Sequence, residues 1–226
     1  MRLKSFFMES SDSVQDYLKA IYLLAQMEDE VTTSAIAERL GVSPASVTSM
    51  IKRLAERGHL KHRRYQGVEL TETGRAMALE VIRHHRLLEA YLSKALGMDW
   101  DRVHEEAEVL EHAISEEFED RIAEYLGHPT HDPHGDPIPP KRGRHREVSH
   151  SALSSFQNGT ATIERVSDRD PDALRYLDRL GLRPGARITV EEHAPFGGPV
   201  WVKVGRRRHA LGRELAETIF VSKGEG

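Results

Sequence analysis

The sequence predicts a mainly α-helical chain that ends in a small β domain. Apolar residues recur at helical spacing between Ser13 and Leu126, and one hairpin pattern interrupts them near Gly67. After residue 150, strand-like runs at Thr160–Val166, Arg187–Glu192 and Val200–Val204 alternate with turns rich in glycine and proline, and a short helix is expected near Pro171–Leu180. The predicted fold class is therefore an N-terminal winged helix-turn-helix (residues 1–77), a helical domain (78–130), a linker (131–150) and an SH3-like small β-barrel (151–226).

Three helical segments and a hairpin define the N-terminal domain. An apolar stripe predicts the first helix at Ser13–Met27, and a short second helix at Ala35–Leu40 ends at Gly41. Ser43-Pro44 begins the third helix, because serine suits the N-cap and proline suits the first helical position. Gly58 ends that helix, and the strand-like runs that follow are Leu60–Arg64 and Val68–Leu70.

The third helix and the hairpin carry the side chains expected on a DNA-binding surface. Small hydroxyl residues stand near the N-terminus of the helix, and cations follow in its later turns and in the hairpin. Such a helix N-terminus suits a major groove flanked by phosphates. The alternative is any small helical domain with a hairpin. The candidate DNA-binding residues are Ser43, Pro44, Ala45, Ser46, Thr48, Ser49, Lys52, Arg53, Arg57, Arg63, Arg64 and Tyr65.

The middle of the chain predicts three further helices, at Thr73–Arg86, Leu87–Leu96 and Asp101–Leu126. Apolar residues of the last helix recur every three to four positions and could form either a seam with a partner helix or a core within one chain. A two-fold protein suits a palindromic DNA site, which favours a homodimer. The seam residues are Val103, Ala107, Leu110, Ile114, Phe118, Ile122 and Tyr125.

The most informative local pattern is an acidic face in that long helix. On a continuous helix, His104, Glu108, Glu111 and His112 fall within about 100° of one another. His85 and Glu89, one helical turn apart, stand upstream. A divalent cation is the simplest group that neutralises such donors, although an acidic face is often merely solvated.

Composition limits which metals and which partners are plausible. The chain has no cysteine, which excludes disulfides, thiolate zinc sites and iron–sulfur clusters, and the remaining donors favour Mn²⁺, Fe²⁺, Co²⁺ or Ni²⁺. Residues 31–75 hold eight Lys/Arg and four Asp/Glu, whereas residues 99–124 hold two and eleven. The positive charge of the first segment favours binding to a polyanion such as DNA, and the negative charge of the second favours binding to cations. No secretion signal or membrane span is expected, so the predicted location is the cytoplasm.

Five segments resemble the iron- and manganese-dependent repressors of the diphtheria-toxin-repressor type. They are AIAERLGVSPASVTSMIKRL (35–54), LTETGRAMA (70–78), RHHRLLEAYL (83–92), VHEEAEVLEH (103–112) and DPHGDPIP (132–139). With the C-terminal barrel, the resemblance covers nearly the whole chain. The ordered pair of HR-L-L-E and H-E-x-A-x-x-x-E-H is its most specific part.

The resemblance implies two metal sites in each chain. The ligands of the first, activating site fall on Asp16, Glu108, Glu111 and His112. Those of the second fall on His85, Glu89 and His104. In several relatives the barrel adds a carboxylate or amide to the second site, and the candidates here are Asp168, Asp170 and Asp172.

The ligand types favour Mn²⁺, with Fe²⁺ as the second choice. Iron-type members have cysteine where this chain has Glu108, and a thioether where it has Asp16, so hard oxygens replace sulfur. Lys19 stands where the shorter manganese-type members have a second acid, which argues against a two-metal site of their kind. Since the ligating histidines must be neutral, metal sensing is expected to weaken below about pH 6.

The expected function is metal-dependent regulation of transcription, by a homodimer that binds a palindromic promoter when it is metal-loaded. Repression of metal-uptake genes is what the resemblance implies. One alternative is a winged-helix regulator that senses an organic ligand. A metallohydrolase is disfavoured and no enzyme is expected, because the H-E-x-x-H spacing is missing: Glu108 stands where the second histidine belongs.

Overall fold

The computed structural model describes residues 12–27, 30–62, 67–141 and 150–224. The chain forms two compact units. The first runs to His84 and includes Glu111–Ala113; the second comprises His85–Leu110 and the chain from Ile114 onward. Among the described residues, no helix is long and apolar enough to cross a membrane.

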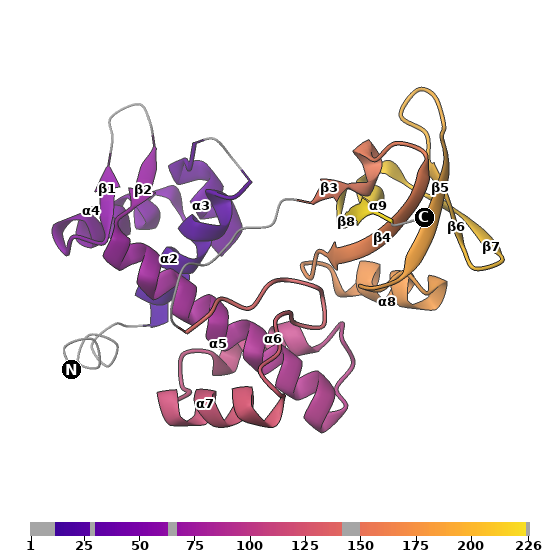
Figure 1. Cartoon of the computed structure of the whole chain (residues 1–226). Helices are drawn as coiled ribbons and strands as arrows, with labels where there is room; N and C mark the ends of the chain where they lie inside the picture. Colours follow the sequence, from indigo (N-terminus) through magenta and orange to yellow (C-terminus); the bar gives the residue numbers. More distant parts are fainter. Residues whose placement is uncertain (1–11, 28–29, 63–66, 142–149, 225–226) are drawn as a thin grey trace. The chain divides into compact units, whose positions relative to one another are not determined.

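The first unit is a winged helix-turn-helix, which confirms the predicted fold of the N-terminal part (Figure 1). Strands β1 and β2 pair antiparallel, with Leu60 opposite Leu70. The predicted caps are present: Gly41 has φ 63° at the end of α3, and the Ser43 hydroxyl accepts a hydrogen bond from the Ser46 amide at the start of α4. The elements are α2 (Asp12–Leu24), α3 (Thr33–Leu40), α4 (Pro44–Glu56), β1 (Leu60–His62), β2 (Val68–Leu70) and the first half of α5 (Glu72–Leu96).

The core of this unit explains which face of α4 remains exposed. Val47, Ile51 and Leu54 of α4 are buried against α2 and α3, where Leu18 and Ile36 have no exposed surface. Burying apolar area at this spacing stabilises the helix on one side only. The opposite side of α4 therefore faces solvent.

The middle helices differ from the sequence prediction in two ways. The two helices expected at Thr73–Arg86 and Leu87–Leu96 are one continuous helix, α5, because no glycine or proline stands at their expected junction. The long helix expected at Asp101–Leu126 is instead two: α6 (Val103–Leu110) and α7 (Glu116–Tyr125). Ser115 begins α7, since its hydroxyl accepts from the Phe118 amide and three acids follow in the first turn.

The break between α6 and α7 also divides the expected seam. Val103, Ala107 and Ile122 are buried inside this chain, so this part of the repeat is core. Phe118 and Tyr125 remain 46% and 68% exposed, together with Leu110 at the end of α6. Only the exposed residues are available to a partner helix.

The C-terminal part of the second unit is a six-stranded antiparallel sheet in the order β3-β8-β4-β5-β6-β7 (Figure 1). The predicted strands and the predicted helix at Pro171–Leu180 are present. Strands β3, β7 and β8 were not predicted. Leu174 and Leu177 of α8 pack into the core beside Ile163 and Val202 of the sheet. The elements are β3 (Ser151–Ala152), η1 (Leu153–Ser155), β4 (Gly159–Val166), α8 (Pro171–Leu180), β5 (Arg187–His193), β6 (Val200–Val204), β7 (Arg207–Leu211), α9 (Arg213–Glu217) and β8 (Ile219–Lys223).

The start of the expected linker is packed rather than exposed. Asp132 accepts hydrogen bonds from the amides of His134 and Asp136, at 2.8 and 3.0 Å, and His134 has no exposed surface. Gly135 has φ 89°, and a Cβ there would lie 1.9 Å from the carbonyl oxygen of Glu164 on β4. The tight turn thus lets the chain lie directly against the sheet.

Arg86 and Asp136 connect this turn to α5. Arg86 donates to the carbonyl oxygen of Pro137 and to Asp136 Oδ1, at 2.6 and 2.9 Å. Arg165 of β4 donates to the same Asp136 oxygen at 3.2 Å. Within the second unit, these bonds hold the end of β4, and the chain that follows it, beside α5.

Candidate metal centres and nucleic-acid surface

The exposed face of α4 carries the candidate DNA-binding residues, and their hydroxyls are not equally available. Thr48 Oγ1 donates to the carbonyl oxygen of Pro44 at 2.9 Å, and the hydroxyls of Ser43 and Ser46 lie 2.9 Å apart. Ser49 is exposed, as are Ala45 and the cations Lys52, Arg53 and Arg57. Arg63, Arg64 and Tyr65 lie outside the described residues.

A first cluster of candidate ligands lies in the first unit, where α2 meets the turn that follows α6. His112 Nε2 lies 2.8 Å from Asp16 Oδ1 and 3.5 Å from Glu111 Oε1. His112 Nδ1 lies 2.7 Å from Gln15 Oε1, so that Nδ1 donates to the amide oxygen and Nε2 faces the carboxylates. Because α6 ends at Leu110, Glu111 and His112 are not on the helical face predicted for them.

Lys19, one turn after Asp16 on α2, contacts the same cluster. Its ammonium lies 2.7 and 3.0 Å from the two carboxylate oxygens of Glu111. Lys19 is 8% exposed and Glu111 is fully buried. This cation therefore compensates a carboxylate that water does not reach.

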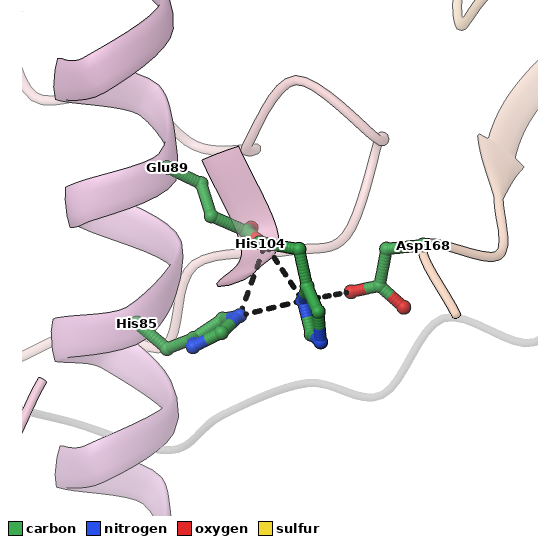
Figure 2. Close-up of side chains that lie close together, drawn as sticks. All are labelled: His85, Glu89, His104 and Asp168. Carbon is green, nitrogen blue, oxygen red and sulfur yellow. Dashed lines mark hydrogen bonds and ion pairs between the residues drawn. The ribbon is translucent and has the colours of Figure 1, made fainter. Parts of the chain in front are cut away.

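A second cluster lies in the second unit and joins three elements (Figure 2). His85 and Glu89 come from α5, His104 from α6, and Asp168 from the segment between β4 and α8. Glu89 Oε1 lies 2.9 Å from His85 Nε2 and 3.1 Å from His104 Nδ1, and Asp168 Oδ2 lies 3.1 Å from that same nitrogen. The two imidazole nitrogens are 3.1 Å apart, so four donor atoms converge on one point.

The other two barrel acids lie elsewhere. Asp170 begins α8, where its carboxylate accepts from the amides of Asp172 and Ala173. Asp172 is 89% exposed and pairs with Arg175. Of the three candidates, only Asp168 is brought to the second cluster.

Glu108 lies beside the second cluster in the second unit. Its Oε1 is 3.8 Å from His85 Nδ1 and 3.7 Å from His104 Nε2, and its side chain is 43% exposed. Its assignment to the first site stays a prediction from the resemblance.

The charges of the second cluster stabilise one another. Burial opposes ionisation of Glu89, but His85, His104 and His134 hold the pKa of its carboxyl well below the usual range. Burial also disfavours the imidazolium form of His104, yet hydrogen bonds and charges from Asp168 and Glu89 raise its pKa to about 10. In the first cluster, the hydrogen bond that His112 donates to Asp16 raises the pKa of His112.

These pKa shifts predict how stability depends on pH when metal is chelated. His104 binds its proton more tightly in the folded than in the unfolded chain, so the protonated ring stabilises the fold. This stabilisation is complete below about pH 6.5 and is lost as the pH rises toward 10. We expect the free energy of unfolding, from denaturant titrations in chelator, to fall over this range, and Asp168→Asn to make the fall shallower. Asp172→Asn, on the exposed side of α8, should keep the wild-type slope. Equal slopes for all three proteins would show that Asp168 does not support the charge on His104.

The same shifts revise the expected pH range of metal binding. A histidine with a raised pKa must lose its proton before it can ligate a metal. Since the pKa of His104 is raised to about 10, protons compete with metal at the second cluster well above pH 6, and the raised pKa of His112 favours the proton over metal at the first cluster as well.

Sequence reasoning missed a third group, formed by Glu89, Asp132 and His134. Glu89 Oε2 lies 3.6 Å from His134 Nδ1, and His134 Nε2 donates to the carbonyl oxygen of Trp100 at 2.7 Å. Burial disfavours the charged imidazole, but the hydrogen bond and charge of Glu89 raise the pKa of His134 to about 9. The carboxylate of Asp132 already accepts hydrogen bonds from two backbone amides of its own turn. The D-P-H-G-D-P motif was the only sequence signal of this packing.

Three protein-family models match successive parts of the chain. The model "Iron dependent repressor, N-terminal DNA binding domain" matches residues 9–68, and "Iron dependent repressor, metal binding and dimerisation domain" matches residues 71–140. A third model, the FeoA domain, matches residues 152–223.

Known proteins and solved structures agree with these matches. The iron-dependent repressor IdeR of Mycobacterium bovis is 33% identical over 95% of this chain and 99% of its own length. The regulator MntR of Lysinibacillus sphaericus is 37% identical over 50% of this chain and 81% of its own length. A manganese-dependent transcriptional repressor solved with manganese is 41% identical, has a TM-score of 0.87, and is matched over 93% of this chain and 99% of that one.

Proposed function

This chain belongs to the family of iron-dependent repressors, and from that premise we propose that it is activated by Mn²⁺ and binds a palindromic operator as a homodimer. It is a metal-dependent transcriptional repressor and not an enzyme. We further propose that the genes it represses serve metal uptake.

The observation that supports metal activation is the convergence of oxygen and nitrogen donors in each unit. Asp16, Glu111 and His112 bring their donor atoms within 4.8 Å of one another, and so do the four residues of the second cluster. Carboxylates and imidazoles that are buried or partly buried at these distances fit one divalent cation in each cluster. We propose these two clusters as the two metal sites of the chain, with His85, Glu89, His104 and Asp168 as ligands of the second.

The donor types support Mn²⁺ as the activating ion. Asp16 and Glu108 offer carboxylate oxygens where iron-type relatives offer sulfur, and the chain has no cysteine. Hard oxygen donors favour Mn²⁺ over softer ions. Fe²⁺ stays the second choice, because imidazole and carboxylate also suit it.

The residues of the first cluster link α2 to the segment between α6 and α7. A bound cation would add to the positive charge that Lys19 and His112 place beside Glu111 and Asp16. Gln15 orients the His112 ring so that Nε2 faces Asp16. Because α2 and α4 contribute to the same hydrophobic core of the first unit, the state of the cluster can affect how α4, the proposed DNA-recognition helix, is held.

The exposed residues of α4 are proposed to contact DNA, and the exposed apolar residues of α6 and α7 to form the dimer interface. Ser49 offers a hydroxyl to base edges, and Lys52 offers charge to phosphates. Two copies related by a two-fold axis would place two such helices on a palindromic site.

Footprinting on a palindromic promoter site tests this proposal. With Mn²⁺ we expect protection of both half-sites, and with chelator an affinity about 5–150 times weaker, the usual range of allosteric coupling. Protection that is equal in Mn²⁺ and in chelator would overturn metal activation. Protection of one half-site alone would overturn the two-fold mode of binding.

A further inference from the structure

The Lys19 ammonium bonds to a carboxylate of the first cluster without being one of the proposed metal ligands. Its Nζ contacts both oxygens of Glu111, at 2.7 and 3.0 Å, and the side chain of Glu111 has no exposed surface. Lys19 follows Asp16 by three positions on α2, so one helix carries both a candidate ligand and this cation.

A buried carboxylate needs a partner at all times. Without one, the cost of removing Glu111 from water would oppose folding of the first unit, and breaking a buried ion pair is among the most destabilising of single changes. His112 Nε2 is 3.5 Å from Glu111, farther than the Lys19 ammonium, which is 2.7 Å away. Lys19 is therefore the closer compensating charge.

The same contact opposes metal binding. Both oxygens of Glu111 are engaged by the ammonium, so a cation that Glu111 ligates must share or replace these bonds. Lys19 also carries a positive charge that repels any divalent ion a few ångströms away, and this repulsion is strong where water is excluded.

We infer that Lys19 is a built-in counter-cation of the activating site: it holds the metal-free site together through Glu111 and raises the metal concentration at which the repressor is loaded. This inference rests on the proposed function, because it takes Asp16, Glu111 and His112 as the site. It predicts opposite effects of one substitution on stability and on metal affinity.

Lys19→Met keeps the length of the side chain and removes its charge. In chelator we expect the melting temperature to fall by roughly 6–20 °C, the range for loss of one partner of a buried ion pair in a chain of this size. In calorimetric titrations with Mn²⁺ we expect the variant to bind about 10-fold or more tightly at the site that His112→Ala removes. Lys19→Arg should stay close to wild type in both measurements, and Lys94→Met, an exposed position on α5, is the matched control.

A second variant separates loss of the pair from general damage to α2. In Lys19→Met/Glu111→Gln both charges are gone, so we expect the chelator melting temperature to recover most of the loss. If the double variant is as unstable as Lys19→Met, or if Lys19→Met leaves both melting temperature and Mn²⁺ affinity unchanged, the inference is wrong. His112→Ala in the wild-type background tests the proposed site by itself. If this substitution does not alter Mn²⁺ binding, the assignment of the activating site is wrong.

Discussion

Replacing His112 with alanine is expected to abolish Mn²⁺-dependent operator binding while the protein stays folded. His112 supplies the only nitrogen donor of the first cluster, and its Nε2 lies 2.8 Å from Asp16. Loss of a ligand removes a direct metal bond, whereas loss of an outer partner such as Gln15 is expected to cost about 10–100-fold in affinity. We therefore expect a fall of at least about 100-fold in Mn²⁺ affinity at this site, measured by calorimetry, and no footprint at metal concentrations that saturate the wild type.

His128→Asn is the matched control for this substitution. His128 is exposed after α7 and has φ 56°, a conformation that asparagine tolerates. Its footprint and Mn²⁺ affinity should match those of the wild type. If His112→Ala still binds the operator in a Mn²⁺-dependent way, the first cluster is not the activating site.

Glu89→Ala is expected to have the largest effect on stability in the absence of metal. Glu89 is fully buried, and its carboxylate oxygens lie 2.9, 3.1 and 3.6 Å from ring nitrogens of His85, His104 and His134. Removing one member of a buried charge network typically costs about 3–5 kcal/mol. We expect a loss of about this size in the free energy of unfolding in chelator. The loss should grow as the pH falls below about 6.5. Without Glu89, the buried histidines of the folded variant bind protons weakly, whereas the same histidines become protonated in the unfolded chain. This difference favours unfolding at low pH.

The control for Glu89→Ala is Glu106→Ala on the exposed side of α6. Surface substitutions of this kind usually change stability by less than about 0.5 kcal/mol. A loss of stability in Glu89→Ala that is no larger than in Glu106→Ala would mean that the carboxylate does not balance the three histidines.

The local signals of the N-terminal domain predict its structure correctly because they act over a few residues. Ser43 caps α4, Gly41 adopts positive φ, and the apolar stripe of α4 is buried as its period predicts. The strands β4, β5 and β6 were also found from alternation and flanking turns. Strand β7, with its run of arginines, has no such pattern and was missed.

The break between α6 and α7 shows where periodicity misleads. Apolar spacing continues from Val103 to Tyr125, so the sequence predicts one helix. The Ser115 cap and the bond between His84 Nδ1 and the carbonyl of Glu111, 3.2 Å long, instead accompany a turn at Glu111–Ala113. That turn takes Glu111 and His112 off the helix and into the first unit.

The sequence alone is enough to identify the family, the winged helix-turn-helix, the absence of sulfur ligands other than methionine, and most of the candidate ligands. These follow from residue identity and short-range spacing. It could not show that Lys19 pairs with Glu111 across 92 positions, that His134 is buried against Glu89, or that Asp168 rather than Asp170 or Asp172 joins the second cluster. The reason is physical: these partners are chosen by which charges become buried together, and burial is a property of the packed chain.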